Sequence, residues 1–121
     1  MSTIKIFCTT GQIDQAMKTY RGERTFDGIV VTVDGQALDE QRDLKNFSDN
    51  SFEWGYEGNE SRQLALAILA DCMDSEAVLA HVEGFMREIV ANFSNEWEIT
   101  DAQVAKAVAD LSRLSNPAAD R

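Results

Sequence analysis

The sequence predicts a single α+β domain, in which a small N-terminal antiparallel β-sheet is followed by three helices. Strand-forming residues gather in the first 40 positions, Asp34 and Gly35 mark a turn, and helical periodicity begins after position 62. A length of 121 residues suits one domain. We expect a β-hairpin region at 1–38, a loop at 39–61, a helical part at 62–115 and a tail at 116–121.

The sheet is predicted from two strand-forming segments. Residues 4–8 alternate weakly and favour a short strand, and residues 9–19 are ambiguous, since their apolar side chains could line a short helix. Residues 28–33, rich in valine and isoleucine, form the clearest strand. The Asp34-Gly35 dipeptide supplies the positive φ angles of a tight turn, so residues 36–38 are expected to return as a short strand.

The first helix is predicted at about 62–73. Its residues are strong helix formers and apolar on every side, which indicates a helix buried all round. Asn59 or Ser61 is the expected N-cap, because their side chains can accept a hydrogen bond from the first turn.

Two further helices follow. A stripe of apolar residues at helical spacing predicts a helix from about 75 to 93. The last helix begins at Asp101, where Thr100 and Gln103 have the spacing of a capping box, and Pro117 ends it.

The charge of the chain is strongly negative and uneven. Its formal net charge is −10, and residues 39–60 carry seven acidic residues against two basic ones. Such a field repels the phosphate backbone, so direct nucleic-acid binding is disfavoured, and it attracts basic protein surfaces, including those that hold DNA or RNA. The other interpretation is that the charge only keeps the protein soluble.

The candidate binding site is the acidic, aromatic loop that precedes the first helix. Aromatic side chains offer a large contact area, and carboxylates beside them accept hydrogen bonds from arginine and lysine. Alternatively, the aromatic side chains turn inward to pin the loop to the core, and the small basic patch at residues 20–24 pairs with Glu53 or with another acid of the loop. The predicted partner-binding residues are Asp49, Glu53, Trp54, Tyr56, Glu57 and Glu60.

The sequence contains few of the residue patterns that conventional catalysis uses. The single histidine, His81, lies on a helix flank, and we find no nucleophile elbow, zinc motif or calcium loop. The isolated cysteines Cys8 and Cys72 are expected to be buried thiols in a reducing cytosol. The residues therefore predict no catalytic group, metal or cofactor, and the protein is expected not to be an enzyme.

The sequence also bears on location and assembly. No apolar run approaches the roughly 20 residues that span a bilayer, and the N-terminus lacks the pattern of a signal peptide. We therefore expect a cytoplasmic protein of a bacterial host cell, without membrane contact. The apolar helices could also supply a homodimer face.

Four segments together carry a family resemblance. They are residues 20–22, residues 31–35 with Leu38, residues 52–56 (Phe-Glu-Trp-Gly-Tyr) and residues 63–67 (Gln-Leu-Ala-Leu-Ala). With them the chain, from about Lys18 to Leu111, resembles the DUF6166 family of small proteins from bacteria, phages and other mobile elements. The family pattern has histidine where this chain has Phe47, and more glycine where it has Glu57 and Glu60. The resemblance implies context rather than an activity.

Small size, acidity and the resemblance together predict an inhibitor. We expect an acidic phage or mobile-element protein that binds a basic surface of a nucleic-acid-handling defence complex, such as a CRISPR effector, in place of nucleic acid. One alternative is a small ligand-binding module or enzyme that uses residues 53–60. Another is an inert domain whose loop only completes the core.

Overall fold

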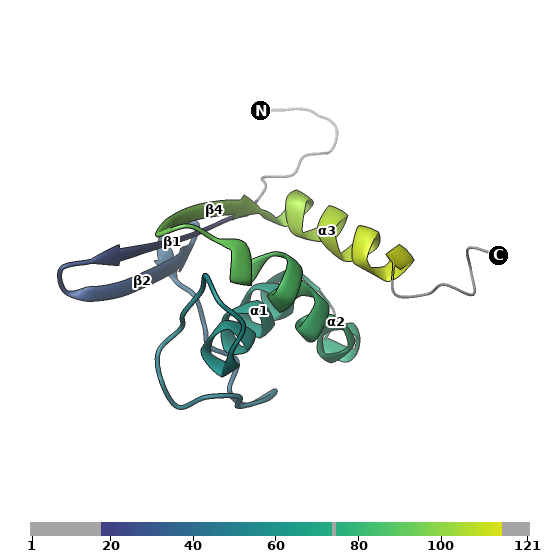
Figure 1. Ribbon diagram of the computed structural model, residues 1–121, viewed down its shortest axis with the longest axis horizontal. Helices are drawn as coiled ribbons and strands as arrows, with labels where there is room; N and C mark the ends of the chain where they lie inside the picture. Colours follow the sequence, from purple (N-terminus) through teal and green to yellow (C-terminus); the bar gives the residue numbers. More distant parts are fainter. Residues whose placement is uncertain (1–17, 74, 115–121) are drawn as a thin grey trace, which may run out of the picture.

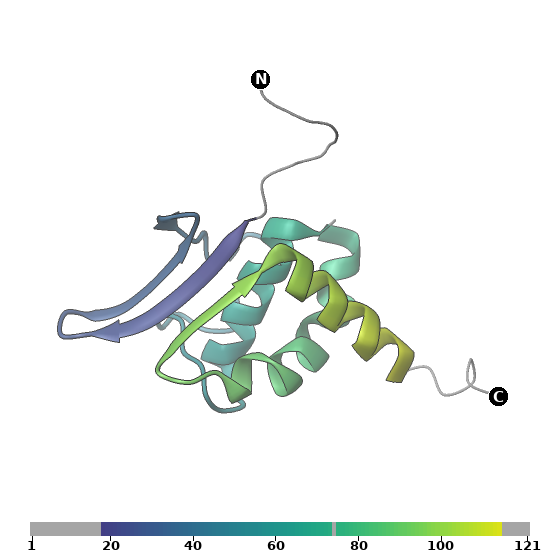
Figure 2. The same cartoon turned by 90° about the horizontal axis from the view of Figure 1, so that it is seen from above.

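A four-stranded antiparallel sheet forms one layer of the molecule, and the helices lie on one side of it, with the last helix running on from the end of the sheet beside the second (Figures 1 and 2). The computed structural model describes residues 18–73 and 75–114. The strand expected at 4–8, most of the ambiguous segment at 9–19 and the tail at 116–121 lie outside the described residues. The predicted α+β class is confirmed. The strand order is β3-β2-β1-β4, and the strands are β1 (Thr19–Thr25), β2 (Gly28–Val33), β3 (Gln36–Ala37) and β4 (Glu96–Thr100).

The predicted strand at 28–33 and the turn after it are confirmed. Asp34 and Gly35 have φ angles of 51° and 84°, as a tight hairpin turn requires. The returning strand β3 is one residue shorter than expected, because Leu38 is buried and the chain turns away after its N–H bonds to the carbonyl of Val31 (3.2 Å).

Strand β1, which lies between β2 and β4, was not predicted. It pairs with β2 from Tyr20 opposite Val33 to Thr25 opposite Gly28. Thr19, Tyr20 and Thr25 favour a strand, but Gly22 and Glu23 between them are unfavourable, so the local signal is weak. The segment is a strand because β2 and β4 supply hydrogen-bonding partners on both of its edges.

Strand β4 is the second missed strand, and it lies in the connection between the second and third predicted helices, within the part at 62–115 that was described as helical. It pairs antiparallel with β1, from Thr100 opposite Thr19 to Glu96 opposite Glu23. Trp97 and Ile99 face the helices while Glu96 and Glu98 are exposed, so the residues alternate as in a half-buried strand. That alternation is the sequence signal that could have revealed it.

Helix α1 (Asn59–Cys72) is the buried helix that was predicted, and it begins three residues early. Leu64 to Leu69 are all buried. The expected N-cap is wrong: Gly58 occupies that position, and no side chain caps the helix. Ser61 instead donates a hydrogen bond from its hydroxyl to the carbonyl of Tyr56 (2.7 Å), which ties the loop to the first turn.

Helices α2 (Ser75–Glu88) and α3 (Asp101–Leu114) complete the layer. Helix α2 ends earlier than predicted, and a short 3₁₀ turn, η1 (Val90–Asn92), follows it. The capping box is confirmed, since the backbone N–H of Gln103 donates to Thr100 Oγ1 (3.2 Å) and the backbone N–H of Thr100 donates to Gln103 Oε1 (2.9 Å). In the described part of the chain, no helix has the length and apolar character to cross a membrane.

Candidate functional site

The aromatic residues of the predicted site do not share one environment. Trp54 is only 1% exposed and Phe52 is also buried, so both belong to the core. The expectation that Trp54 contacts a partner is therefore wrong. Burial of the indole in the core is the physical reason. Tyr56 is 45% exposed and is the one aromatic side chain of the three that a partner can reach.

Glu53 pairs with an arginine of β1, as the second interpretation of the loop predicted. Its Oε1 accepts a hydrogen bond from Nη2 of Arg24 at 2.6 Å. The same guanidinium donates to the carbonyl of Trp54 (3.1 Å) and lies 4.6 Å from the centre of the indole ring. Arg24 thus holds this part of the loop against the sheet through charge, hydrogen bonding and a cation–π contact.

Two other predicted acids also have basic neighbours within the chain. Glu57 lies 3.5 Å from Arg87 of α2. Asp49 lies 3.6 Å from Arg42 and accepts a hydrogen bond from the side-chain amide of Asn46 (2.8 Å). Such exposed pairs contribute little to stability, yet they reduce the negative charge that the loop presents to a partner.

Glu60, the last predicted residue, is held by neutral donors. Its carboxylate accepts hydrogen bonds from Asn50 Nδ2 (3.0 Å), the Tyr56 hydroxyl (2.9 Å) and the Ser48 hydroxyl (2.9 Å). These bonds, with that of Asn50 foremost, lower the pKa of Glu60 to about 2. Partial burial and the bond to Glu60 raise the pKa of the Tyr56 hydroxyl. The cluster is a well-satisfied structural network.

The loop is ordered by two polar side chains that bond to its backbone. Arg42 donates to the carbonyls of Ser48 and Asn50, the latter at 2.8 Å. Buried Gln63 of α1 accepts from the backbone N–H of Phe47 (2.7 Å) and donates to the carbonyl of Glu40 (2.7 Å). These side chains therefore satisfy backbone groups of a long loop that has no helix or strand of its own.

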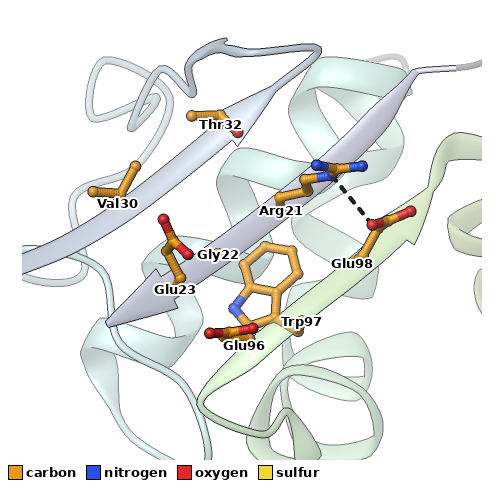
Figure 3. A pocket seen from close by; sticks show the side chains of 8 residues that line it. All are labelled: Arg21, Gly22, Glu23, Val30, Thr32, Glu96, Trp97 and Glu98. Atoms are coloured by element: carbon orange, nitrogen blue, oxygen red, sulfur yellow. Dashed lines mark ion pairs between the residues drawn. The ribbon is translucent and has the colours of Figure 1, made fainter. Parts of the chain in front are cut away.

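The outer face of the sheet, which sequence reasoning missed, carries acids that no residue in the described part of the chain neutralises. Glu23 of β1 lies directly opposite Glu96 of β4, and neither makes an ion pair with a described residue. Beside them, Arg21 pairs with Glu98 at 3.1 Å. Figure 3 shows these four side chains on the same side of β1 and β4. The face therefore has three carboxylates and one guanidinium.

This acidic face is hollowed rather than flat. A depression of about 460 Å³ lies over β1, β2 and β4, and Val30 and Thr32 of β2 form its other side. Val30 is 44% exposed, and Phe26 at the tip of the β1–β2 hairpin is fully exposed. The hairpin tip extends beyond the helices (Figure 1). Apolar contact area and unneutralised carboxylates thus occur together on this face.

The floor of the depression is made by Gly22 and Trp97, which lie opposite each other on β1 and β4. The indole of Trp97 stacks on Phe93 (4.3 Å between ring centres) and meets Trp54 edge to face (5.7 Å). Because Gly22 has no side chain, the indole can lie directly across β1. The indole nitrogens of Trp54 and Trp97 are buried without an acceptor among the described residues.

The profile of a protein family, described as a family of unknown function (DUF6166), matches residues 20–110. The chain belongs to the DUF6166 family. No curated protein and no solved structure gives a significant match.

The residues through which the chain resembles DUF6166 have structural contacts in this fold. Trp54 fills the core, Glu53 fixes Arg24, and Gln63 bonds to the loop backbone. Tyr20 is buried, with its hydroxyl donating to Asp71 Oδ2 (2.8 Å). In this DUF6166 protein, the residues that carry the resemblance therefore attach the acidic loop and fill the core. They do not indicate which residues a ligand would contact.

Other reactive groups of this DUF6166 protein are isolated. Cys72 is half-buried at the end of α1, and burial raises the pKa of its thiol, whereas Cys8 lies outside the described residues. His81 is half-buried on α2. Within residues 18–73 and 75–114, no group of histidine, cysteine, aspartate or glutamate side chains is arranged to hold a metal ion. The outer sheet face is the best candidate site.

Proposed function

We propose that this protein acts by binding rather than by catalysis, and that its partner is a basic protein surface. In the finer form of the proposal, that surface belongs to a nucleic-acid-handling defence complex such as a CRISPR effector, which the protein inhibits by occupying a groove built for DNA or RNA. The binding face in this proposal is the outer face of the sheet, in place of the loop at 39–61.

The observation that supports the proposal is the register of Glu23 and Glu96. Like charges directly opposite each other in an antiparallel ladder destabilise the sheet. A lysine or arginine from a partner would relieve this repulsion, because it could approach both carboxylates at once. The acids of the loop present less uncompensated negative charge to a partner, since Arg24, Arg42 and Arg87 already pair with several of them.

The overall charge supports the same partner chemistry. A net charge of −10 favours encounter with basic surfaces and disfavours encounter with free nucleic acid. The hollow of about 460 Å³ and the exposed Val30 add contact area beside the carboxylates. Affinity is therefore expected to combine salt-sensitive attraction with apolar contact.

The test compares two charge reversals that change the net charge equally. Glu96→Lys places a cation opposite Glu23 and is expected to stabilise the fold by several tenths of a kcal/mol, about 0.5 kcal/mol. Glu88→Lys alters an exposed acid at the end of α2, an element that is not part of the sheet. Because neither variant is expected to unfold the protein, a loss of binding confined to Glu96→Lys reports on the face itself.

Binding is measured with a purified CRISPR effector complex, with and without its nucleic acid, at low and high salt. The proposal expects salt-sensitive binding that nucleic acid competes away, an affinity about tenfold weaker for Glu96→Lys, and little change for Glu88→Lys. Equal losses in both variants would reduce the effect to net charge and overturn the assigned face. Absence of binding by the wild-type protein would overturn the assigned partner.

A further inference from the structure

The outer edge of β2 is only half paired. Strand β3 covers Thr32 and Val33, and the N–H of Leu38 extends the pairing by one bond to the carbonyl of Val31 (3.2 Å). Beyond that point the chain leaves the sheet for the loop. The first half of β2, from Gly28 onward, has a neighbour on the β1 side alone among the described residues.

The register shows which backbone groups face the unpaired edge. The N–H of Asp34 donates to the carbonyl of Thr19 (2.9 Å), and these two residues are directly opposite in the β1–β2 ladder. In an antiparallel ladder, hydrogen-bonded pairs alternate with pairs that are not bonded to each other. Val30 therefore bonds to β1, whereas the N–H and C=O of Ile29 point to the open edge. Neither group of Ile29 has a partner among the described residues.

A groove of about 310 Å³ runs beside this edge. Ile29, Val31, Leu38 and Phe52 line its inner side, so most of the side chains there are apolar. Val30 and Thr32, whose side chains belong to the outer face, line its other side. An unpaired strand edge with an apolar groove beside it has the geometry for β-strand addition.

We propose that the edge of β2 at Ile29 accepts an extended segment of the partner protein as an additional strand. Successive side chains of a strand point to opposite faces, so the segment must alternate. Apolar side chains would enter the groove beside Phe52, and lysine or arginine side chains between them would extend over β2 on the outer face toward Glu23, the nearer of the two facing acids. The basic half of this pattern rests on the proposed function; the backbone pairing rests on Ile29 alone.

The probe is a synthetic eight-residue peptide in which lysine and valine alternate. Amide hydrogen exchange of the full chain is followed by NMR, residue by residue, with and without the peptide. The amide of Ile29 is expected to exchange at least about tenfold more slowly at saturation, because a free N–H becomes hydrogen-bonded. The amide of Val30 serves as the internal reference, since it already bonds to β1.

Two control peptides sharpen the test. One has the same composition with all lysines in one half, and the other carries N-methyl groups on its valines and cannot form a ladder. Both are expected to leave the exchange of Ile29 unchanged. Equal protection by either control would overturn strand addition, as would an Ile29 amide that is already protected in the free protein, where another part of the chain would occupy the edge.

The two proposals fail in different ways. Binding of the alternating peptide without slower exchange at Ile29 overturns strand addition and leaves the acidic face in place. Protection of Ile29 that is equally strong in Glu96→Lys overturns the role of the acidic face and leaves strand addition in place. If the alternating peptide does not bind at all, the proposed alternating pattern of the partner segment is overturned.

Discussion

Replacement of Gly22 by alanine is expected to destabilise the fold by about 3 kcal/mol. The new Cβ would lie 2.3 Å from Nε1 of Trp97 and 2.4 Å from its Cε2, far inside a normal contact. The indole cannot withdraw, because it stacks on Phe93 and meets Trp54 on another side. Overpacking a core typically costs about 1–3 kcal/mol, and this rigid cluster of rings puts Gly22 at the upper end of that range.

The matched control is Gly84→Ala in α2, where the same added methyl group has room. Its Cβ would meet Cδ1 of Leu111 at 3.8 Å, an ordinary contact. Since glycine inside a helix is less stable than alanine, this variant should gain about 0.5 kcal/mol. Urea unfolding followed by tryptophan fluorescence measures both. A Gly22→Ala protein within about 0.5 kcal/mol of wild type would refute the argument that Trp97 needs the missing side chain.

Two titratable groups give further predictions. Hydrogen bonds, first that of Asn50, lower the pKa of Glu60 from 4.5 to about 2 on folding. The stability that this carboxylate contributes is complete above pH 4.5 and is lost as the pH falls toward 2. In the Glu60→Gln variant, the unfolding free energy should therefore fall less steeply between pH 4.5 and 2. An unchanged pH dependence in that range would contradict the assignment. Burial raises the pKa of Cys72. In a Cys8→Ser background, its alkylation at about pH 8 should therefore be slower in the folded protein than in urea, and equal rates would be the contrary result.

Local signals in the sequence were sufficient for several elements. The strand at 28–33, the turn at Asp34 and the capping box at Thr100 were predicted, because propensity, turn chemistry and capping depend on neighbouring residues. The burial of α1 was also predicted, because its residues are apolar on every side of the helix. The pairing of Glu53 with an arginine of residues 20–24 was among the alternatives and is confirmed at Arg24.

The loop illustrates the limit of reading charge from a sequence. Its acids were expected to bind a basic partner, and the composition of residues 39–60 supports that expectation when it is taken alone. In the fold, Arg24 and Arg87 approach from β1 and α2 and pair with Glu53 and Glu57. Compensation by residues distant in the chain cannot be deduced from a local count of charges.

By itself, the sequence determined the α+β class, the acidity of the chain and the family to which it belongs, since these follow from composition, periodicity and motif. Only the tertiary structure decided where that acidity is unneutralised. Glu23 and Glu96 are far apart in the chain and become neighbours through the register of β1 with β4. Likewise, the backbone groups of Ile29 have no partner within residues 18–73 and 75–114 because β3 ends where it does. Strand register depends on long-range hydrogen bonding and on which face is buried, and no local pattern encodes it.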